Sequence, residues 1–248
     1  MTTLADQKTT ELTALTTPVE ADLLQIIDDV AGSPITKKIT IQDLLSLFTS
    51  NVTVQVLSAA SGTYTPTARM KKVLLIAVGP GGNGANITGA DDAAGGGGGG
   101  GCAIKLLDAA TVGASKAYTV GQTSGNNTTF NTSTLVANSG SNGSATGNTT
   151  TLGANAAGGA GGAASGGDLN IPGEAGQRAI IFSTTHGSGG RGGSSAFGNG
   201  GAASGTEAVG AAGGAYGGGG AGGHTASDVD RTGGAGAAGV IFAIEFLA

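Results

Sequence analysis

The side chains of this chain that could do chemistry lie in two short stretches of its second half. Residues 178–186 read Arg-Ala-Ile-Ile-Phe-Ser-Thr-Thr-His, and residues 224–231 read His-Thr-Ala-Ser-Asp-Val-Asp-Arg. The imidazoles of His186 and His224 could bind zinc, but a zinc site needs several ligands at short spacing. Neither histidine has an HxxxH or HxxE companion. We therefore expect no metal site.

No motif predicts an enzyme. Residues 79–84 fit the GxGxxG pattern of dinucleotide-binding loops. Glycine is so frequent here that such matches arise by chance, and residues 85–89 predict no helix to hold a pyrophosphate. The chain has no P-loop and no nucleophile elbow. A glycan hydrolase needs two carboxylates, and Asp228 and Asp230 are the nearest sequence candidates, but their sequence spacing alone indicates nothing. We expect no catalytic residues and no cofactor.

Charge and hydropathy narrow the class of protein further. The net charge is −5 and the chain has 11 Lys and Arg residues in total, without a basic stripe, so nucleic acid is not an expected partner. Residues 1–6 lack the cationic start and apolar run of a secretory signal, and no apolar run approaches 18 residues. We expect synthesis in a cytoplasm and no membrane insertion.

The single cysteine, Cys102, excludes an intrachain disulfide and has apolar neighbours typical of a buried position.

These few reactive side chains must be positioned by an unusual scaffold, because 49 of the 51 glycines lie after residue 78. Ordering glycine costs more backbone entropy than ordering any other residue. Collagen requires glycine at every third position and abundant proline, which the sequence lacks. A flexible linker is a second interpretation, but the runs alternate with apolar strands and carry little charge. The third is a set of polyglycine-II helices, which have three residues per turn and satisfy their backbone groups by lateral hydrogen bonds.

The remaining elements are mainly strands. We expect a hairpin over 22–41 and a short helix over 43–48, which together form a module at residues 1–50. Residues 51–78 are expected to be connecting strands that lead into a glycine-rich body at 79–248. The predicted fold class is mainly β: a small N-terminal β-hairpin plus helix anchor, then a β-sandwich-like glycine-rich domain with packed polyglycine-II helices. Strands over 72–78 and 240–247 open and close the body.

Recognition residues are expected in the segments that interrupt the glycine runs, because loops on a rigid frame usually carry binding. Residues 180–182 could instead form one more core strand, and the charges of 228–231 could simply be solvated. Aromatic residues at 197 and 216 could stack on a sugar or cap the scaffold. The candidate receptor-binding residues are His186, Arg191, Phe197, Tyr216, His224, Asp228, Asp230 and Arg231.

The pattern of residues 62–248 resembles the glycine-rich domain at the ends of bacteriophage tail fibres and related virion appendages. The landmarks include Gly-Thr-Tyr-Thr-Pro at 62–66, Gly-Pro-Gly-Gly at 79–82, the glycine run 95–101 and Gly-Asp-Leu-Asn-Ile-Pro-Gly at 167–173. Residues 12–40 are similar to N-terminal modules of phage fibre proteins. The chain departs from the family in its long insertion at 178–186 and in its lack of tryptophan.

The resemblance implies a homotrimeric fibre or spike of a virion, a tail fibre or adhesin, made in the host cytoplasm. Residues 1–50 would contact other virion proteins, and the interrupting loops would contact a host surface glycan or outer-membrane protein. Because the chain is short, a head fibre or capsid decoration protein with a weak adhesive role is an alternative. An ice-binding protein is a rival of another class, since some of these also pack polyglycine helices, and a glycan depolymerase is a third hypothesis.

Overall fold

The computed structural model describes residues 23–28, 35–41, 44, 51–89, 92–147, 153–183, 186–205, 207–227 and 229–247. The chain divides into two compact units, Met1–Asn51 with Ala248 and Val52–Leu247.

The first unit contains the expected hairpin. Strands β1 (Leu23–Asp28) and β2 (Ile35–Thr40) pair antiparallel over their whole length. The turn expected over 31–34 lies outside the described residues. Of the helix expected over 43–48, only Leu44 is described, and its backbone is helical.

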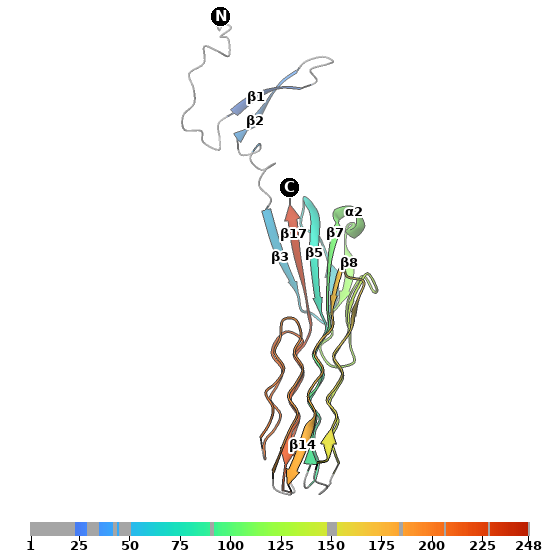
Figure 1. Cartoon of the computed structure of the whole chain (residues 1–248). Coiled ribbons are helices and arrows are strands. Elements are labelled where there is room, and N and C mark those ends of the chain that lie inside the picture. Colours follow the sequence, from blue (N-terminus) through green and yellow to red (C-terminus); the bar gives the residue numbers. More distant parts are fainter. Residues whose placement is uncertain are drawn as a thin grey trace, which may run out of the picture. The chain divides into compact units, whose positions relative to one another are not determined.

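The second unit begins with a sandwich of two five-stranded antiparallel sheets, which occupies the upper part of this unit in Figure 1. The first sheet contains, in spatial order, β13 (Leu169–Ile171), β7 (Cys102–Asp108), β5 (Met70–Val78), β17 (Val240–Leu247) and β3 (Asn51–Leu57). The second sheet contains β12 (Ala164–Ser165), β10 (Leu135–Ala137), β9 (Thr128–Phe130), β8 (Lys116–Thr119) and β4 (Ser61–Tyr64). A single turn of helix, α2 (Ala109–Val112), follows β7. Residues 51–78, expected to be connecting strands, thus supply strands to both sheets.

Side chains from both sheets fill the sandwich core, because alternate residues of each strand point to the same face. The rings of Tyr64 and Phe130 meet in it with centroids 5.6 Å apart. The buried core residues are Leu57, Tyr64, Met70, Val73, Leu75, Ala77, Ala103, Leu107, Val112, Val120, Phe130, Leu135, Ala137, Ile241 and Ala243.

One carboxylate is fully buried at the edge of this core. Glu245 of β17 accepts hydrogen bonds from the hydroxyl of Tyr64, from Nε2 of Gln55 at 2.9 Å and from the backbone N–H of Thr67 at 3.1 Å. Burial and the adjacent Glu245 carboxylate raise the pKa of Tyr64, so its hydroxyl remains a donor. A buried charge is tolerated only when it is well hydrogen-bonded. These hydrogen bonds link β17 to Gln55 of β3, to Tyr64 of β4 and to Thr67 in the connection that follows β4.

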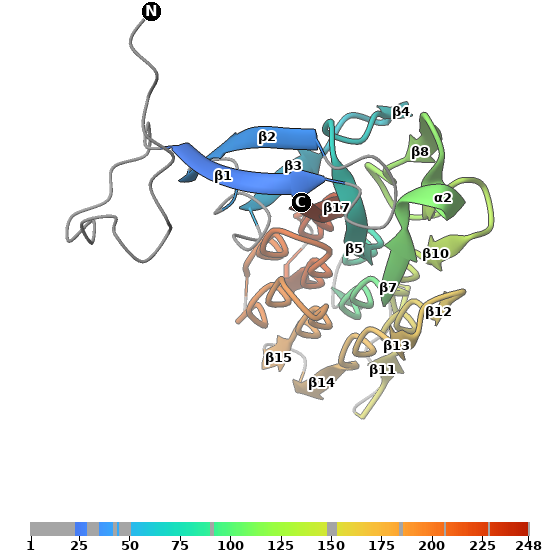
Figure 2. The same cartoon turned by 90° about the horizontal axis from the view of Figure 1, so that it is seen from above.

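Below the sandwich, the described chain runs back and forth in ten extended segments that lie side by side (Figure 1). Figure 2 views them end-on, and they are seen as small coils. We number them segments 1 to 10 in chain order: 79–86, 94–101, 138–146, 157–163, 172–178, 189–194, 198–205, 209–215, 217–223 and 232–239.

Their hydrogen bonds repeat every three residues. In segment 2 the N–H groups of Gly95 and Gly98 donate to the carbonyls of Ser144 and Ser141 in segment 3, at 2.8 and 2.9 Å. The intervening N–H groups donate to segments 5 and 9, and the carbonyls of segment 2 accept from segments 1, 4 and 6. A period of three with only lateral bonds is the pattern of polyglycine-II helices. Packed helices of this kind, expected from the sequence, are therefore present.

The same bonds order the described segments into three layers. Segments 3, 1 and 10 form one outer layer, segments 4, 2, 9 and 8 the middle layer, and segments 5, 6 and 7 the other outer layer. Segments 2 and 9 each bond to six neighbouring segments of the described chain, and the others bond to three or four. Side-chain packing is thereby replaced by a lattice of backbone hydrogen bonds.

Close approach of neighbouring backbones explains why the inner positions are glycine. A Cβ atom built on Gly98 would lie 2.1 Å from the carbonyl oxygen of Ala160, and one on Gly97 would lie 2.1 Å from that of Gly82. Real Cβ atoms do not approach oxygens so closely, so no other residue fits there. Neither glycine has the positive φ that would by itself demand glycine. Absence of a side chain, rather than backbone freedom, is the property used.

Outer segments carry side chains at the positions that face away from the lattice. In segment 4 the alanines at 157, 160 and 163 are exposed, whereas Gly159 and Gly162 are buried. Glycine content therefore follows the number of neighbours: segment 2 is continuous glycine from 95 to 101, and segment 4 has two glycines per turn. The mainly β class with a sandwich and packed polyglycine helices, as expected from the sequence, is confirmed.

Candidate functional site

At the end of the bundle opposite the sandwich, short connections join the segments in pairs, and their described residues form what we call the tip (Figure 1). The tip comprises residues 87–89, 92–93, 147, 153–156, 179–183, 186–188, 207–208, 224–227 and 229–231.

Two small sheets hold the tip together. One has the order β11 (Asn155–Ala156), β14 (Ala179–Ser183) and β15 (His186–Ser188), and the other pairs β16 (His224–Thr225) with β6 (Asp92–Ala93). Between them lies a small core of Ala93, Ala156, Ala179 and Ile181. The core strand considered for residues 180–182 therefore exists, but only alternate residues belong to the core.

The opposite side of β14 is an exposed apolar surface, which we call the β14 face. Ile180 is 41% exposed and Phe182 is 63% exposed. Asn155 of β11 and Ser188 of β15 lie directly opposite Ile180, so all three side chains are on the same side of the sheet. His186, at the start of β15, is exposed beside them. An aromatic and an aliphatic side chain are thus presented together at the tip.

Polar groups surround the β14 face. Nη1 of Arg178 donates to Oδ1 of Asn155 at 3.3 Å, which holds the guanidinium against the edge of the sheet. The hydroxyl of Ser183 lies 3.3 Å from Nδ1 of His186. An apolar centre with a hydrogen-bonding rim is the usual composition of a protein-binding patch.

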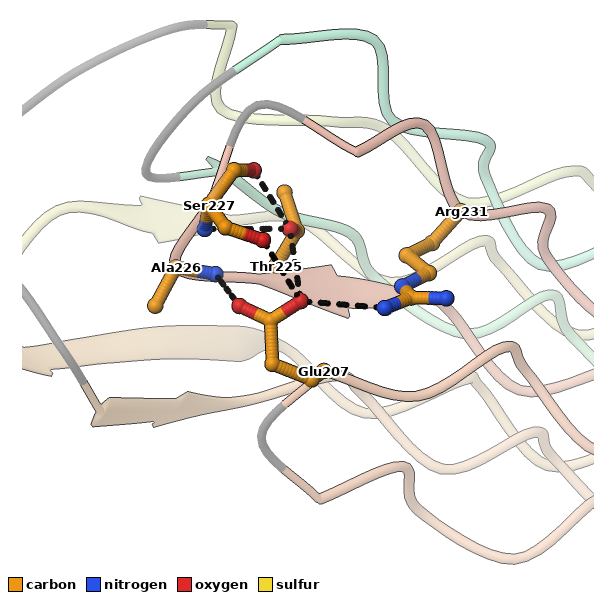
Figure 3. A network of polar contacts seen from close by, with 5 residues as sticks. All are labelled: Glu207, Thr225, Ala226, Ser227 and Arg231. Carbon is orange, nitrogen blue, oxygen red and sulfur yellow. Dashed lines mark hydrogen bonds and ion pairs between the residues drawn. The ribbon is translucent and has the colours of Figure 1, made fainter.

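A second polar network ties another part of the tip together, and Figure 3 shows its five residues. Oε1 of Glu207 accepts the backbone N–H of Ala226 at 2.7 Å. Its Oε2 accepts from Ser227 Oγ at 2.9 Å, Arg231 Nη2 at 3.1 Å and Thr225 Oγ1 at 3.2 Å. Glu207 therefore links the turn after segment 7 to both ends of the connection over 224–231.

These donors also set the protonation state of Glu207. The backbone N–H of Ala226 and then the guanidinium of Arg231 lower the pKa of the carboxyl to about 2. The backbone of Glu207 has a φ of 55°, in the left-handed region that non-glycine residues seldom adopt. The carboxylate is held in place by its partners, and this arrangement suits a structural clamp better than a proton-transfer group.

His224, expected at the binding surface, is instead interior. Its exposed fraction is 2%, and a Cβ on Gly187 would lie 2.2 Å from its Nε2, so the ring occupies the space left by that glycine. Asp92, in the strand paired with β16, is also buried, and it accepts a hydrogen bond from Oγ1 of Thr146 at 2.7 Å. A ring this deeply buried is not accessible at the surface of the tip, so the structure does not support His224 as a contact residue.

The two aromatic candidates lie at the other end of the bundle. Phe197 and Tyr216 pack on Phe242 of β17, with ring centroids 5.8 and 5.7 Å from it. They cap the junction between the bundle and the first sheet, which was the alternative weighed for them. Arg191 is exposed on the outward side of segment 6 and is not part of the tip.

Only part of the charged stretch over residues 228–231 can be placed. Asp230 is exposed, and Arg231 is the partner of Glu207. Asp228 lies outside the described residues, so the pair of carboxylates considered for hydrolysis is not described. The candidates that the structure places on the accessible tip are therefore His186, Asp230 and, in part, Arg231.

In comparisons with known proteins, no protein-family model matches the sequence and no curated protein matches it. Among the described residues there is no group of three or more His, Cys, Asp or Glu side chains that could hold a metal ion. In the same part of the chain, no helix is long and apolar enough to cross a membrane.

Three residues of the tip, Ile180, Phe182 and Glu207, were not among the candidates taken from the sequence. The alternation of Ala179, Ile180, Ile181 and Phe182 could have identified Ile180 and Phe182, because a strand with one buried face exposes every second residue. Glu207 carries no such signal. Its partners are 18 to 24 residues away in sequence, so only the packing of the segments shows its role.

A polar groove of about 350 Å³ lies on the outer layer made by segments 3, 1 and 10. Asn83 and Asn86 line it, and their side-chain oxygens accept the N–H groups of Gly236 and Gly233 at 2.8 and 2.9 Å. Asn142 accepts the N–H of Asn83 in the same way, at 2.8 Å. The amides thus replace a missing neighbouring segment at the surface of the lattice.

Proposed function

We propose that this chain is a non-enzymatic attachment protein of a bacteriophage particle, a short fibre or spike whose tip binds the host cell surface. In this proposal residues 1–50 attach to other virion proteins, and the glycine-rich bundle carries the tip away from the particle. The observation that carries the proposal is the β14 face, where Phe182 is 63% exposed beside Ile180 at the end of the bundle.

The bundle supports such a role because it holds the tip in a fixed arrangement. Segments 2 and 9 are bonded to neighbours on all sides within the described chain, so bending would break many hydrogen bonds together. A surface that is ordered before binding loses less conformational entropy on binding than a flexible one. A binding surface on this support needs only a few exposed side chains.

The composition of the β14 face favours a protein receptor over a glycan. Aromatic side chains in a partly desolvated centre dominate protein interfaces, and Phe182 fits that role. Ile180 next to it offers neither a flat ring for a sugar nor a hydrogen-bonding group. An outer-membrane protein with an apolar pocket is therefore the better-supported receptor.

The ice-binding rival has less support. That function needs a flat and regular face of threonine or alanine. The outer layer of segments 3, 1 and 10 is hollowed by the polar groove, and it carries asparagines whose oxygens accept backbone N–H groups, with glycines beside them. Thermal hysteresis of the purified chain tests this rival directly.

Binding of the purified full chain to host cells tests the proposal. Phe182→Ser is expected to lower binding by about tenfold or more, as loss of a central aromatic residue does at protein interfaces. Val209→Ser is the matched control, because Val209 is 58% exposed on segment 8 outside the β14 face. Both variants should keep the thermal midpoint of the parent. Unchanged binding of a Phe182→Ser, Ile180→Ser double variant would contradict the proposal.

The attachment end needs its own test. Deletion of residues 1–50 is expected to abolish incorporation into particles while the second unit stays folded, since the boundary between the units lies at residue 51. Particles that still contain the truncated chain would contradict the anchor assignment without touching the proposal for the tip.

A further inference from the structure

The two outer faces of the sandwich have opposite compositions, although the same alternation builds both. On the second sheet, the register places small and mostly polar side chains on the outer face: Ser61, Thr63, Ala117, Thr119, Thr129, Val136 and Ser165. This face has the composition expected of a sheet that meets water.

The outer face of the first sheet is aliphatic instead. Leu57 of β3 belongs to the sandwich core, so Val52, Val54 and Val56 point to the opposite side. They are 54%, 55% and 52% exposed. In a row across three strands, Ile244 lies opposite Leu74, and Leu74 lies opposite Leu106. The members that we call the aliphatic face are Val52, Val54, Val56, Leu74, Leu106, Leu169, Ile244 and Phe246.

The part of this sheet nearest the bundle is covered by described residues. There Tyr216 and Phe197 pack on Phe242, and Val78 and Cys102 are fully buried. Beyond that cap, Leu106 is 45% exposed and Leu169 is 53% exposed. The described residues therefore leave an apolar sheet face open to solvent, and an exposed apolar patch of this kind is often functional.

We propose that the aliphatic face is an interface between copies of this chain. The exposed fractions correspond to about 500 Å² of apolar surface, which is more than half of the roughly 800 Å² that each partner buries in a standard interface. Pairing along the free edge of β3 would add backbone area to this value.

The charges at the border of the face also suit a second copy. Nζ of Lys72 lies 3.7 Å from Oδ1 of Asp108, and both side chains are more than half exposed. One copy thus presents a positive and a negative group side by side, and an identical copy presents the complement of each. A partner with a strong net charge of one sign would not be complementary to this face, because the two opposite charges lie side by side. The proposal does not depend on what the tip binds.

The mass of the full chain in solution, measured by sedimentation over a range of concentrations, tests the proposal. The parent is expected to associate reversibly, and Val54→Lys should raise the dissociation constant by about tenfold or more, because it buries a charge in the apolar interface. The matched control is Thr119→Lys, at an exposed position on the outer face of the second sheet. It should associate like the parent, and both variants should have the parent's circular dichroism.

A second readout follows the face itself. Val54→Cys introduces a thiol that can be labelled with a polarity-sensitive fluorophore. The one native cysteine, Cys102, is buried, and burial raises its pKa to about 11, so it does not compete for the label. Emission is expected to shift to the blue as the concentration rises, whereas a label on Thr119→Cys should not respond.

Three outcomes would overturn the proposal. The parent could remain monomeric at every concentration, Thr119→Lys could weaken association as much as Val54→Lys, or the label at position 54 could be shielded in a chain that sediments as a monomer. The last result would mean that something other than a second copy covers the face. None of these outcomes bears on binding by the tip, which is measured on host cells.

Discussion

The sandwich and the polyglycine bundle occupy the same compact unit but are stabilised in different ways. The sandwich has a core of side chains from two sheets, in which fifteen of the described residues are buried. The bundle has almost no interior side chains, and its segments are joined by backbone hydrogen bonds in three directions. The comparison shows two ways to order a region of the chain. The sandwich is ordered by the burial of apolar side chains, and the bundle is ordered by hydrogen bonds that satisfy its backbone groups.

The difference predicts how each region responds to substitution. A side-chain core can relax around a changed volume, and it tolerates swaps that conserve volume. A backbone lattice has few side chains to move, because the atoms nearest to most inner glycines are carbonyl oxygens of the adjacent segments. We therefore expect substitutions at inner positions of the bundle to be strongly destabilising, and substitutions at outer positions to change stability little.

The largest effect is expected from Gly98→Ala in the middle of segment 2. The new methyl group would meet the carbonyl oxygen of Ala160 at 2.1 Å, so segments 2 and 4 must separate and their hydrogen bonds must break. We expect a loss of more than about 4 kcal/mol of unfolding free energy, or no soluble protein. The measurement is thermal or denaturant unfolding. Ala160→Ser, at an exposed outer position, is the control and should change stability by less than about 0.5 kcal/mol.

Leu75→Ala in the sandwich core should have the next largest effect. Leu75 is fully buried, so the change removes apolar contact and leaves a cavity, at a cost of about 2–5 kcal/mol. Leu75→Met conserves the volume and should cost less than about 1.5 kcal/mol. Denaturant unfolding measures both. If both variants lost the same stability, the distinction between a relaxing core and a rigid lattice would fail.

A smaller loss is expected from Tyr64→Phe. The hydroxyl donates to the buried carboxylate of Glu245, and its removal leaves one of that group's donors missing, at a cost of about 1–3 kcal/mol. Tyr118→Phe is the matched control, because the Tyr118 hydroxyl makes no hydrogen bond within the described chain. Equal unfolding curves for the two variants would show that the Glu245 network does not stabilise the sandwich.

The smallest effect concerns the clamp at the tip. Because its folded-state pKa is lowered from 4.5 to about 2, the Glu207 carboxylate stabilises the tip above pH 4.5. That contribution is lost as the pH falls from 4.5 through about 2. An NMR titration of the Glu207 carboxyl carbon should show the low pKa, and Glu207→Gln should remove the corresponding pH dependence of tip stability. An ordinary pKa for Glu207 would show that the contacts with Ala226 and Arg231 are absent in solution.

Much of the architecture was predictable from particular residues. The uninterrupted glycines at 95–101 predict a segment surrounded on all sides, since any side chain would block a neighbour. The alternation of Val240, Phe242, Ile244 and Phe246 with Ile241 and Ala243 predicts a strand with two apolar faces. Both features are local, and local patterns report the environment of a residue well.

The candidate site was less predictable. His224 and His186 have similar glycine-rich surroundings in the sequence, yet one ring is 2% exposed and the other is exposed. The difference arises because Gly187 leaves space over His224, and that contact joins positions 37 residues apart. Phe197 and Tyr216 were candidates because an aromatic ring can stack on a sugar, but the direction of their segments places them at the end beside Phe242.

The sequence by itself determined that this chain forms strands and polyglycine helices, because both depend on residue type and short-range period. It also determined which positions must lack a side chain. Only the tertiary structure decided the order of the segments in three layers, the clamp around Glu207, and the exposure of Phe182 and of the aliphatic face. Those features depend on which segments become neighbours, and glycine runs that are nearly identical in sequence carry no information about their partners. The few side chains between the runs acquire their roles from that arrangement.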